Sequence, residues 1–179
     1  MKKYDVIIFQ FWFLIFKLFM TKADFLKEPI EHIDFTKIDA SYLIPAMAKM
    51  SFTSRDVARA ADIYIKMLRE NEGTVFLSLA GSTSAAGCMQ VYVDMVRNHM
   101  VDAIIATGAS IVDMDFFEAL GFKHYRGSPF VDDNQMRDLH IDRIYDTFID
   151  EDELKECDTT IAKIADSLEP RPYSSREFI

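Results

Sequence analysis

The pattern of hydrophobic and polar positions is clearest between residues 73 and 107. Residues 73–80 read Gly-Thr-Val-Phe-Leu-Ser-Leu-Ala, a short apolar run typical of a buried parallel strand. A second such run occupies 101–107, and between them lies a stretch with apolar residues at helical spacing, which predicts a helix over 84–98. This order of strand, helix and strand predicts a βαβ unit and therefore an α/β fold.

Small residues follow both predicted strands. Residues 81–87 read Gly-Ser-Thr-Ser-Ala-Ala-Gly, and residues 108–110 read Gly-Ala-Ser. The first loop lies where a helix N-terminus would offer free backbone amides to a phosphate or another anion. Because ligands of open parallel sheets bind at the carboxyl ends of the strands, we expect the two loops to form a single cleft.

The residues of the first loop leave two interpretations open. The loop lacks the GxGxxG dinucleotide fingerprint, and Cys88 follows Gly87 where a Walker A loop would have lysine. Taken alone, the loop is therefore equally compatible with a nucleotide site and with a turn of small residues that lets a helix pack tightly on a strand.

Two helices are predicted before this unit and one after it. Residues 41–50 form a short apolar segment with Pro45 in its first turn, and residues 111–120 follow the second small-residue loop. Between 53 and 68, Thr53 or Ser54 is the expected helix cap. The apolar residues of that helix predict a stripe buried in the core: Val57, Ala61, Tyr64 and Leu68.

The C-terminal third predicts a strand followed by a capped helix. Residues 143–149 alternate as a half-buried strand does, and the acidic residues 150–153 suit the start of a helix. Cys157 falls on the apolar face of that helix and is interpreted as a packing residue. Ser174 and Glu177 have the spacing of a helix cap and first turn.

Residues 1–19 form a hydrophobic extension of doubtful status. The apolar run over 6–16 resembles a signal peptide, but Asp5 and Lys17 flank it and no cleavage site precedes Met20. It is also shorter than the roughly 20 residues of a membrane-spanning helix. We therefore expect Met20 to be the true initiator and 20–179 to form the domain, with a hydrophobic anchor or an extra edge strand as the alternatives.

Composition narrows the class of protein. The chain has 179 residues, of which 50 % are hydrophobic, as expected for one globular domain. Its net charge of −9 disfavours nucleic acids and anionic membranes as partners, and is compatible with a cationic partner such as a polyamine. The two cysteines form no CxxC pair, which fits a reducing cytoplasm.

No catalytic or metal-binding set can be assembled from the residues. The four histidines have no metal-ligand spacing, and no Ser/His/Asp combination can be placed. Lys123 lies beside His124 and Tyr125, but a surface lysine is the simpler interpretation than an activated amine. The predicted catalytic and metal residues are therefore none.

Several blocks of sequence together resemble a known family. They are Asp34-Phe35-Thr36, the stretch 76–87, His99-Met100-Val101-Asp102 with Thr107-Gly108-Ala109, His124-Tyr125-Arg126-Gly127, and Asp142-Arg143-Ile144-Tyr145. From about residue 33 to the end, the chain resembles the deoxyhypusine synthase family, most closely its prokaryotic deoxyhypusine synthase-like branch. The combination of His-Met-Val-Asp and Thr-Gly-Ala after the glycine loop is fairly specific.

The resemblance implies a fold, a cofactor and an assembly. Family members are NAD-dependent transferases on a Rossmann-like, open, mostly parallel sheet with helices on both faces, and are usually homotetramers. This chain would carry the N-terminal part of that domain. By position, the resemblance implies NAD contacts from Gly81, Ser82, Thr83, Thr107, Gly108 and Asp113. Asp115 is a close alternative to Asp113 for the acidic residue near the ribose.

The resemblance also implies a reaction. Family members oxidise spermidine and pass its aminobutyl group through an enzyme lysine to a lysine of a translation factor precursor, while homospermidine synthase relatives use a small amine as acceptor. The family lysine lies in a Trp-Gly-Lys context, and the single tryptophan of this chain is Trp12. Three interpretations stay open: a truncated transferase lacking that lysine, a homospermidine synthase-like enzyme, and a non-catalytic subunit of a full-length partner.

Overall fold

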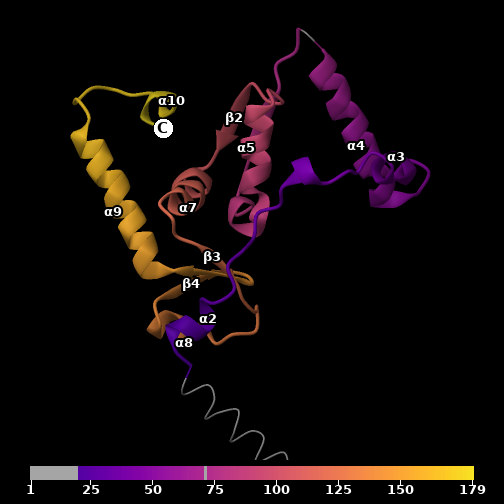
Figure 1. Ribbon diagram of the computed structural model, residues 1–179. Helices are drawn as coiled ribbons and strands as arrows, with labels where there is room; N and C mark the ends of the chain where they lie inside the picture. Colours follow the sequence, from indigo (N-terminus) through magenta and orange to yellow (C-terminus); the bar gives the residue numbers. More distant parts are fainter. Residues whose placement is uncertain (1–19, 71) are drawn as a thin grey trace, which may run out of the picture. The chain divides into compact units, whose positions relative to one another are not determined.

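The computed structural model describes residues 20–70 and 72–179, which divide into two compact units (Figure 1). One unit comprises 31–115, and the other comprises 20–30 together with 116–179. The expectations for residues 1–19 lie outside the described residues. Within the described ranges, none of the helices has both the length and the apolar character that crossing a membrane requires.

The 31–115 unit contains the predicted βαβ arrangement. Its elements are the 3-10 helix η1 (Phe35–Lys37), α3 (Leu43–Met47), α4 (Phe52–Arg69), β1 (Phe76–Leu79), the π-helix η2 (Ser84–Cys88), α5 (Met89–Arg97), β2 (Ala103–Ala106), α6 (Gly108–Ser110) and the π-helix η3 (Ile111–Phe116), whose last residue belongs to the second unit. Strands β1 and β2 pair in parallel, with Phe76 opposite Ala103 and Leu79 opposite Ala106. The βαβ prediction is confirmed, although both strands are shorter than predicted.

A side chain helps to align the starts of the two strands. The Val75 amide donates a hydrogen bond to Oδ2 of Asp102 at 2.7 Å, and the Asp102 amide donates to the Val75 carbonyl at 2.9 Å. Nearby, the hydroxyl of Tyr64 on α4 donates to the Met100 carbonyl at 2.7 Å. The turn that leads into β2 is thus held from two sides.

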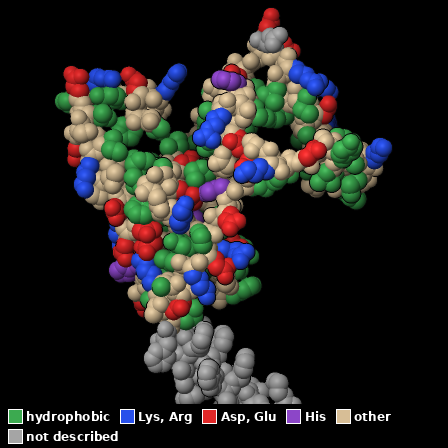
Figure 2. All heavy atoms as spheres, in the orientation of Figure 1, with side chains coloured by type: hydrophobic (Ala, Val, Ile, Leu, Met, Phe, Trp, Pro, Cys, Tyr) green, Lys and Arg blue, Asp and Glu red, His purple; other side chains and the backbone are tan. Residues whose placement is uncertain are grey.

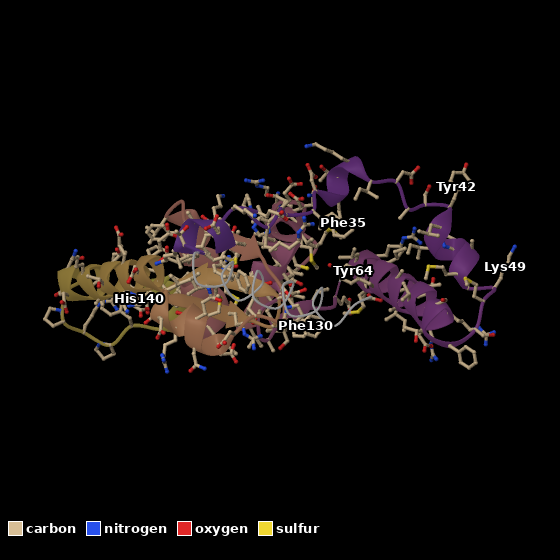
Figure 3. The ribbon with its side chains drawn as sticks, turned by 90° about the horizontal axis from the view of Figure 1, so that it is seen from below. Phe35, Tyr42, Lys49, Tyr64, Phe130 and His140 are labelled. Carbon is tan, nitrogen blue, oxygen red and sulfur yellow. The ribbon has the colours of Figure 1, made fainter. Side chains whose placement is uncertain are left out.

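The apolar face of α4 is largely exposed, so the predicted buried stripe is wrong for two of its four residues. Val57 is 40 % exposed and Leu68 is also exposed, whereas Tyr64 is half-buried. Figure 2 shows apolar side chains gathered at the surface around α3, and Tyr42 points outward there (Figure 3). Helical periodicity identifies which face is apolar, but not which segment covers it.

The start of α4 also differs from the prediction. Ser51 takes an extended conformation and is the residue before the helix, so Thr53 and Ser54 lie inside the first turn. The hydroxyl of Ser51 makes no capping hydrogen bond. The start of the helix is therefore marked by the extended backbone of Ser51 and not by a side-chain cap. The short helix α3 does carry Pro45 in its first turn, as predicted.

The second unit is built on an antiparallel sheet. It contains α2 (Lys22–Phe25), α7 (Phe117–Ala119), β3 (His124–Arg126), α8 (Asp133–Asp138), β4 (Ile141–Ile144), β5 (Thr147–Asp150), α9 (Glu151–Ser167) and α10 (Ser175–Phe178). The strand order is β3-β5-β4, and both pairs are antiparallel. The segment 143–149, predicted as one strand, is divided into a hairpin because Tyr145 has a φ of 56° and begins a turn.

Two helices of this unit, α9 and α10, agree with the sequence patterns. Asp150 caps α9 by accepting hydrogen bonds from the amides of Asp152 and Glu153, and Cys157 is fully buried on the inner face, so its interpretation as a packing residue is confirmed. Ser174 and Glu177 form a reciprocal capping box on α10, as predicted. The mixed α/β class is therefore confirmed, whereas a single mostly parallel Rossmann-like sheet stays a prediction.

Gly127 makes a close contact that leaves no room for a side chain. A Cβ atom at this position would overlap the ring of Phe148, which lies in the core cluster of this unit with Phe25, Met136 and Ile141. The Gly127 amide donates to the Asp146 carbonyl at 2.7 Å, which holds the backbone against the hairpin. The glycine of the His-Tyr-Arg-Gly block therefore has a packing role.

We predict that Gly127→Ala lowers the free energy of unfolding by about 1–3 kcal/mol, because the added methyl group must displace the Phe148 ring. Urea denaturation measures the change. Gly73→Ala is the matched control, since its added Cβ would meet only ordinary contacts with Glu70. Equal stability of Gly127→Ala and the parent chain would contradict the packing role.

We predict that Asp102→Ala lowers the free energy of unfolding by about 1–2 kcal/mol, because the Val75 amide loses a charged acceptor. Asp102→Asn retains an oxygen that can accept this hydrogen bond and should cost less. The same denaturation experiment compares the two variants. A larger loss with asparagine than with alanine would show that the carboxylate acts through something other than this bond.

Acid should weaken the link between α2 and the start of α9. Lys22 Nζ lies 2.8 Å from Asp152 Oδ2, and this hydrogen bond, with a second from His140, lowers the pKa of the Asp152 carboxyl from 3.8 to about 2. A carboxyl with a lowered pKa stabilises the fold above its unfolded pKa, and this contribution is lost as the pH falls from 3.8 through about 2.

Lys22→Met should raise the Asp152 pKa, measured by NMR titration of the carboxyl carbon. Lys155→Met, which removes a partner of Glu151, should move it far less.

Candidate functional site

The loop after β1 contains two glycines with left-handed backbone. Gly81 has a φ of 68°, and a Cβ atom built on it would meet nothing within 4 Å. Gly87, with a φ of 97°, kinks the predicted helix over 84–98 within η2, just before α5 begins at Met89. A residue with a Cβ atom would be strained at both positions. The loop thus has an open side at Gly81 and a bend at Gly87.

The turn between these glycines contains two backbone amides that donate no hydrogen bond to the described residues. Within the described parts of the chain, no hydrogen bond engages the amides of Ser82 and Thr83. The Thr83 hydroxyl accepts a hydrogen bond from Tyr92 on α5 at 2.7 Å, which fixes the turn against the helix. Two unengaged amides just before a helical segment are suited to holding an anion.

The loop after β2 begins with a helix cap. Thr107 is extended, and its hydroxyl accepts a hydrogen bond from the Ser110 amide at 3.3 Å. Gly108 follows as the first residue of α6, again with open space where a Cβ would lie. Asp113 comes later, half-buried in η3, and Asp115 is half-buried in the same element.

A buried serine joins the two loops. The Ser110 hydroxyl donates to the Gly81 carbonyl at 2.9 Å and lies 3.2 Å from the Thr107 hydroxyl. Ser110 is only 1 % exposed. The structure therefore brings Gly81 and Thr107 to the same place, as expected for adjacent loops at the carboxyl ends of parallel strands.

Sequence reasoning missed Ser110. Its signal was present, since it is a hydroxyl residue in the second small-residue loop, but a serine in such a loop has several possible roles. Only the parallel register of β1 and β2 places it opposite the Gly81 carbonyl.

The block around His124 has a structural role in the second unit. The His124 side chain is fully buried, and its Nδ1 lies 2.6 Å from Oε1 of Glu118. Its ring packs at 5.1 Å from that of Phe117. Lys123 is exposed, which agrees with its interpretation as a surface lysine.

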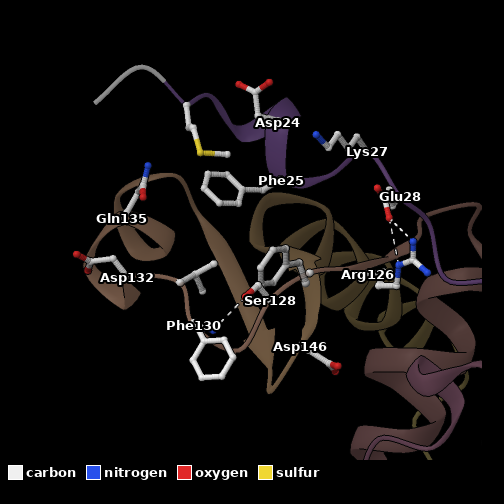
Figure 4. Close-up of a pocket in the computed structure, with 14 residues that line it drawn as sticks. Asp24, Phe25, Lys27, Glu28, Arg126, Ser128, Phe130, Asp132, Gln135 and Asp146 are labelled. Atoms are coloured by element: carbon white, nitrogen blue, oxygen red, sulfur yellow. Dashed lines mark hydrogen bonds and ion pairs between the residues drawn. The ribbon is translucent and has the colours of Figure 1, made fainter. Parts of the chain in front are cut away.

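A separate pocket of about 540 Å³ lies in the second unit (Figure 4). The rings of Phe25 and Phe148, 6.0 Å apart and edge to face, line it, and Phe130 stands at its exposed rim. Its charged lining residues are Asp24, Lys27, Glu28, Arg126, Asp132 and Asp146. Arg126 and Glu28 form an ion pair at 2.6 Å. The sequence did not predict this pocket because its lining comes from three separate segments, 20–28, 126–135 and 146–148.

Comparison with known proteins identifies the family. Residues 42–179 match the family model for deoxyhypusine synthase, and the chain belongs to the deoxyhypusine synthase family. It is 66 % identical over 158 residues to a deoxyhypusine synthase-like protein of Coxiella burnetii and 63 % identical over 158 residues to one of Caulobacter vibrioides. A probable deoxyhypusine synthase 2 of Methanosarcina acetivorans is 36 % identical over 155 residues.

The matches cover most of this chain and less than half of the relatives. The aligned regions comprise 88 % of this chain and 45 % of the Coxiella protein, 88 % and 43 % for the Caulobacter protein, and 87 % and 45 % for the Methanosarcina protein. The chain thus spans about half the length of the curated relatives it matches.

Proposed function

We propose that this chain supplies the NAD-binding part of a deoxyhypusine synthase-like transferase. The observation that carries the proposal is the hydrogen bond from Ser110 to the Gly81 carbonyl, because it joins the two loops that the family resemblance assigns to the cofactor. Membership of a transferase family supports the reaction class. The predicted site residues Gly81, Ser82, Thr83, Thr107, Gly108 and Asp113 all lie in or directly after these loops.

The local geometry fits a dinucleotide. Open space at Gly81 and Gly108 lets a ligand approach the backbone closely, and the unengaged amides of Ser82 and Thr83 suit the pyrophosphate. The carboxylate of Asp113 is the residue type that hydrogen-bonds ribose hydroxyls in dinucleotide sites. When bound, NAD would accept the hydride that leaves the amine substrate, and the loop residues would hold and orient it.

The complete reaction is proposed for the whole family protein. In it, the aminobutyl group of spermidine is transferred to a lysine of a translation factor precursor, and a small amine is the alternative acceptor, as in homospermidine synthases. We assign no catalytic residue in this chain, because none of its lysines has the Trp-Gly-Lys context. A binding or regulatory subunit that completes a full-length partner is the second candidate. We further propose a cytoplasmic homo-oligomer, a tetramer by family resemblance, without nucleic-acid or membrane partners.

The exposed apolar residues of β1 and β2 favour a function in which additional protein covers them. Phe76 on β1 is 60 % exposed and Ile105 on β2 is 58 % exposed, whereas parallel strands are normally covered on both faces. A cofactor bound to these loops would therefore lack contacts that additional protein provides. This is the physical reason to expect weak cofactor binding by the chain alone.

We predict that the isolated chain binds NAD with a dissociation constant above the micromolar range, measured by calorimetric titration. Asp113→Asn should weaken this binding roughly tenfold to a hundredfold, the value of one hydrogen bond to a charged group. Asp62→Asn, on the exposed side of α4, is the matched control. Sub-micromolar affinity would contradict the incomplete cleft, and an absence of binding at millimolar NAD would contradict the cofactor assignment.

Labelled spermidine tests whether the chain alone catalyses the transfer. With NAD and a translation factor precursor, we expect no transfer of label by the chain alone. Addition of a full-length deoxyhypusine synthase-like relative separates the two candidates, because a subunit would co-elute with it and change its rate. Transfer by the chain alone would refute the proposal that the chemistry needs residues from outside these 179.

A further inference from the structure

The pocket of the second unit has an apolar floor and an exposed ring at its rim. Phe25 and Phe148 are buried, and Met20 and Val131 pack against the core cluster to which both belong. Phe130 also lines the pocket, although 90 % of this residue is exposed. A volume of about 540 Å³ falls within the range of small-molecule sites, which are mostly apolar with a few polar groups.

Backbone hydrogen bonds tie the three lining segments together. The Arg126 amide donates to the Glu28 carbonyl at 2.7 Å, which joins the N-terminal segment to β3. The Gly127 amide donates to the Asp146 carbonyl at 2.7 Å, which joins the loop after β3 to the hairpin. The protein itself therefore holds the walls in place, and a ligand would not have to order them.

The charged side chains of the lining leave an excess of carboxylate. Four of them are carboxylates and two are cations. Glu28 is paired with Arg126 at 2.6 Å. Hydrogen bonds from the Thr21 amide and hydroxyl are the main cause of the lowered pKa of the Asp24 carboxyl, and the charge of Lys27 lowers it further. The two cations are thus accounted for by two of the four carboxylates.

The other two carboxylates have no cationic partner. Within the described part of the chain, the Asp146 side chain makes no hydrogen bond or ion pair, and the Asp132 side chain accepts only from the Asn134 amide at 2.9 Å. In the view of Figure 4, Phe130 lies between Asp132 and Asp146 at the rim of the pocket. An aromatic ring attracts a cation over its face, and unpaired carboxylates nearby add to that attraction. The rim is therefore suited to a positive charge.

The floor limits the kind of cation that fits. A charge placed on the rings of Phe25 and Phe148 would lose its water without gaining a partner, which is costly. A polyamine carries charges along its whole length, so it could not fill the pocket without placing one there. A ligand with a single charge at one end of an aromatic body suits both the floor and the rim.

We propose that this pocket binds an arylalkylammonium ion. The aromatic body packs on the floor formed by Phe25 and Phe148, and the ammonium group stays at the rim with Phe130 and the two unpaired carboxylates. The site belongs to a different unit from the loops at 81–83 and 107–108, and it does not depend on the proposed NAD function.

The phenethylammonium ion is the probe, titrated into the 179-residue chain and followed by NMR at the backbone amides of Gly127 and Ser128. Phenethyl alcohol has nearly the same shape and no charge, so it should bind roughly tenfold more weakly. Spermidine should also bind more weakly at these amides than the aromatic ion, although it carries more charge.

Two variants test the rim. Phe130→Ala should weaken binding of the ammonium ion roughly twofold to fivefold and that of the alcohol less, because the ring face that attracts the cation is lost. Asp146→Asn should weaken only the ammonium ion, by roughly twofold. The matched controls, outside the lining, are Phe52→Ala, which removes a ring that is 91 % exposed, and Asp142→Asn, which removes an exposed carboxylate of β4. Both controls should keep the parent affinity.

Equal affinity for the alcohol and the ammonium ion would overturn the proposal, and so would tighter binding of spermidine at the same amides. An absence of shifts at millimolar phenethylammonium would also overturn it. Saturation with NAD should leave the affinity for the ammonium ion unchanged. A failure of the NAD assignment and a failure of this site are therefore told apart by which ligand binds.

Discussion

The reciprocal pair of hydrogen bonds between Val75 and Asp102 sets the geometry on which the candidate site depends. Parallel strands have no turn to fix their alignment, and a slip of one residue would turn every side chain to the other face. The Asp102 side chain and backbone both bind Val75, and Leu79 consequently lies opposite Ala106. With the strand ends level, Ser110 can reach the Gly81 carbonyl. The contact between Val75 and Asp102 at the start of the strands thus helps to bring the Ser110 hydroxyl to the Gly81 carbonyl at their carboxyl ends.

The family-like blocks divide into those that build the fold and those that form the site. In the block 99–102, the Met100 carbonyl accepts a hydrogen bond from the Tyr64 hydroxyl, and Asp102 aligns the strands. This block is therefore structural. In the block 124–127, His124 is buried against Glu118 and Gly127 makes room for Phe148. The loops at 81–83 and 107–108 have unengaged amides or an open side instead. Sequence similarity alone does not separate these roles, because packing constrains a residue as strongly as chemistry does.

Local signals in the sequence were sufficient for the βαβ unit and for the starts of α9 and α10. The apolar runs predicted β1 and β2, and the Ser174 and Glu177 spacing predicted the cap of α10. Long-range pairing was not accessible in this way. The antiparallel sheet joins β3 to β5 although α8 and β4 lie between them in the sequence, and the pocket beside Phe130 draws on three segments. The exposed face of α4 shows the same limit, since periodicity is a property of one helix and burial is a property of its surroundings.

The exposed apolar residues of β1, β2 and α4 have a consequence for the chain in solution. Phe76 and Ile105 on one face of the strand pair, and Ile104 on the other, are exposed apolar side chains that favour self-association. The net charge of −9 opposes self-association by mutual repulsion. This repulsion reaches about 30 Å at 0.01 M salt but only about 8 Å at physiological ionic strength. Dilute buffer should therefore keep the chain dispersed, whereas added salt should drive it into larger particles. The colloidal behaviour of the chain thus follows from exposed apolar side chains on its parallel strand pair.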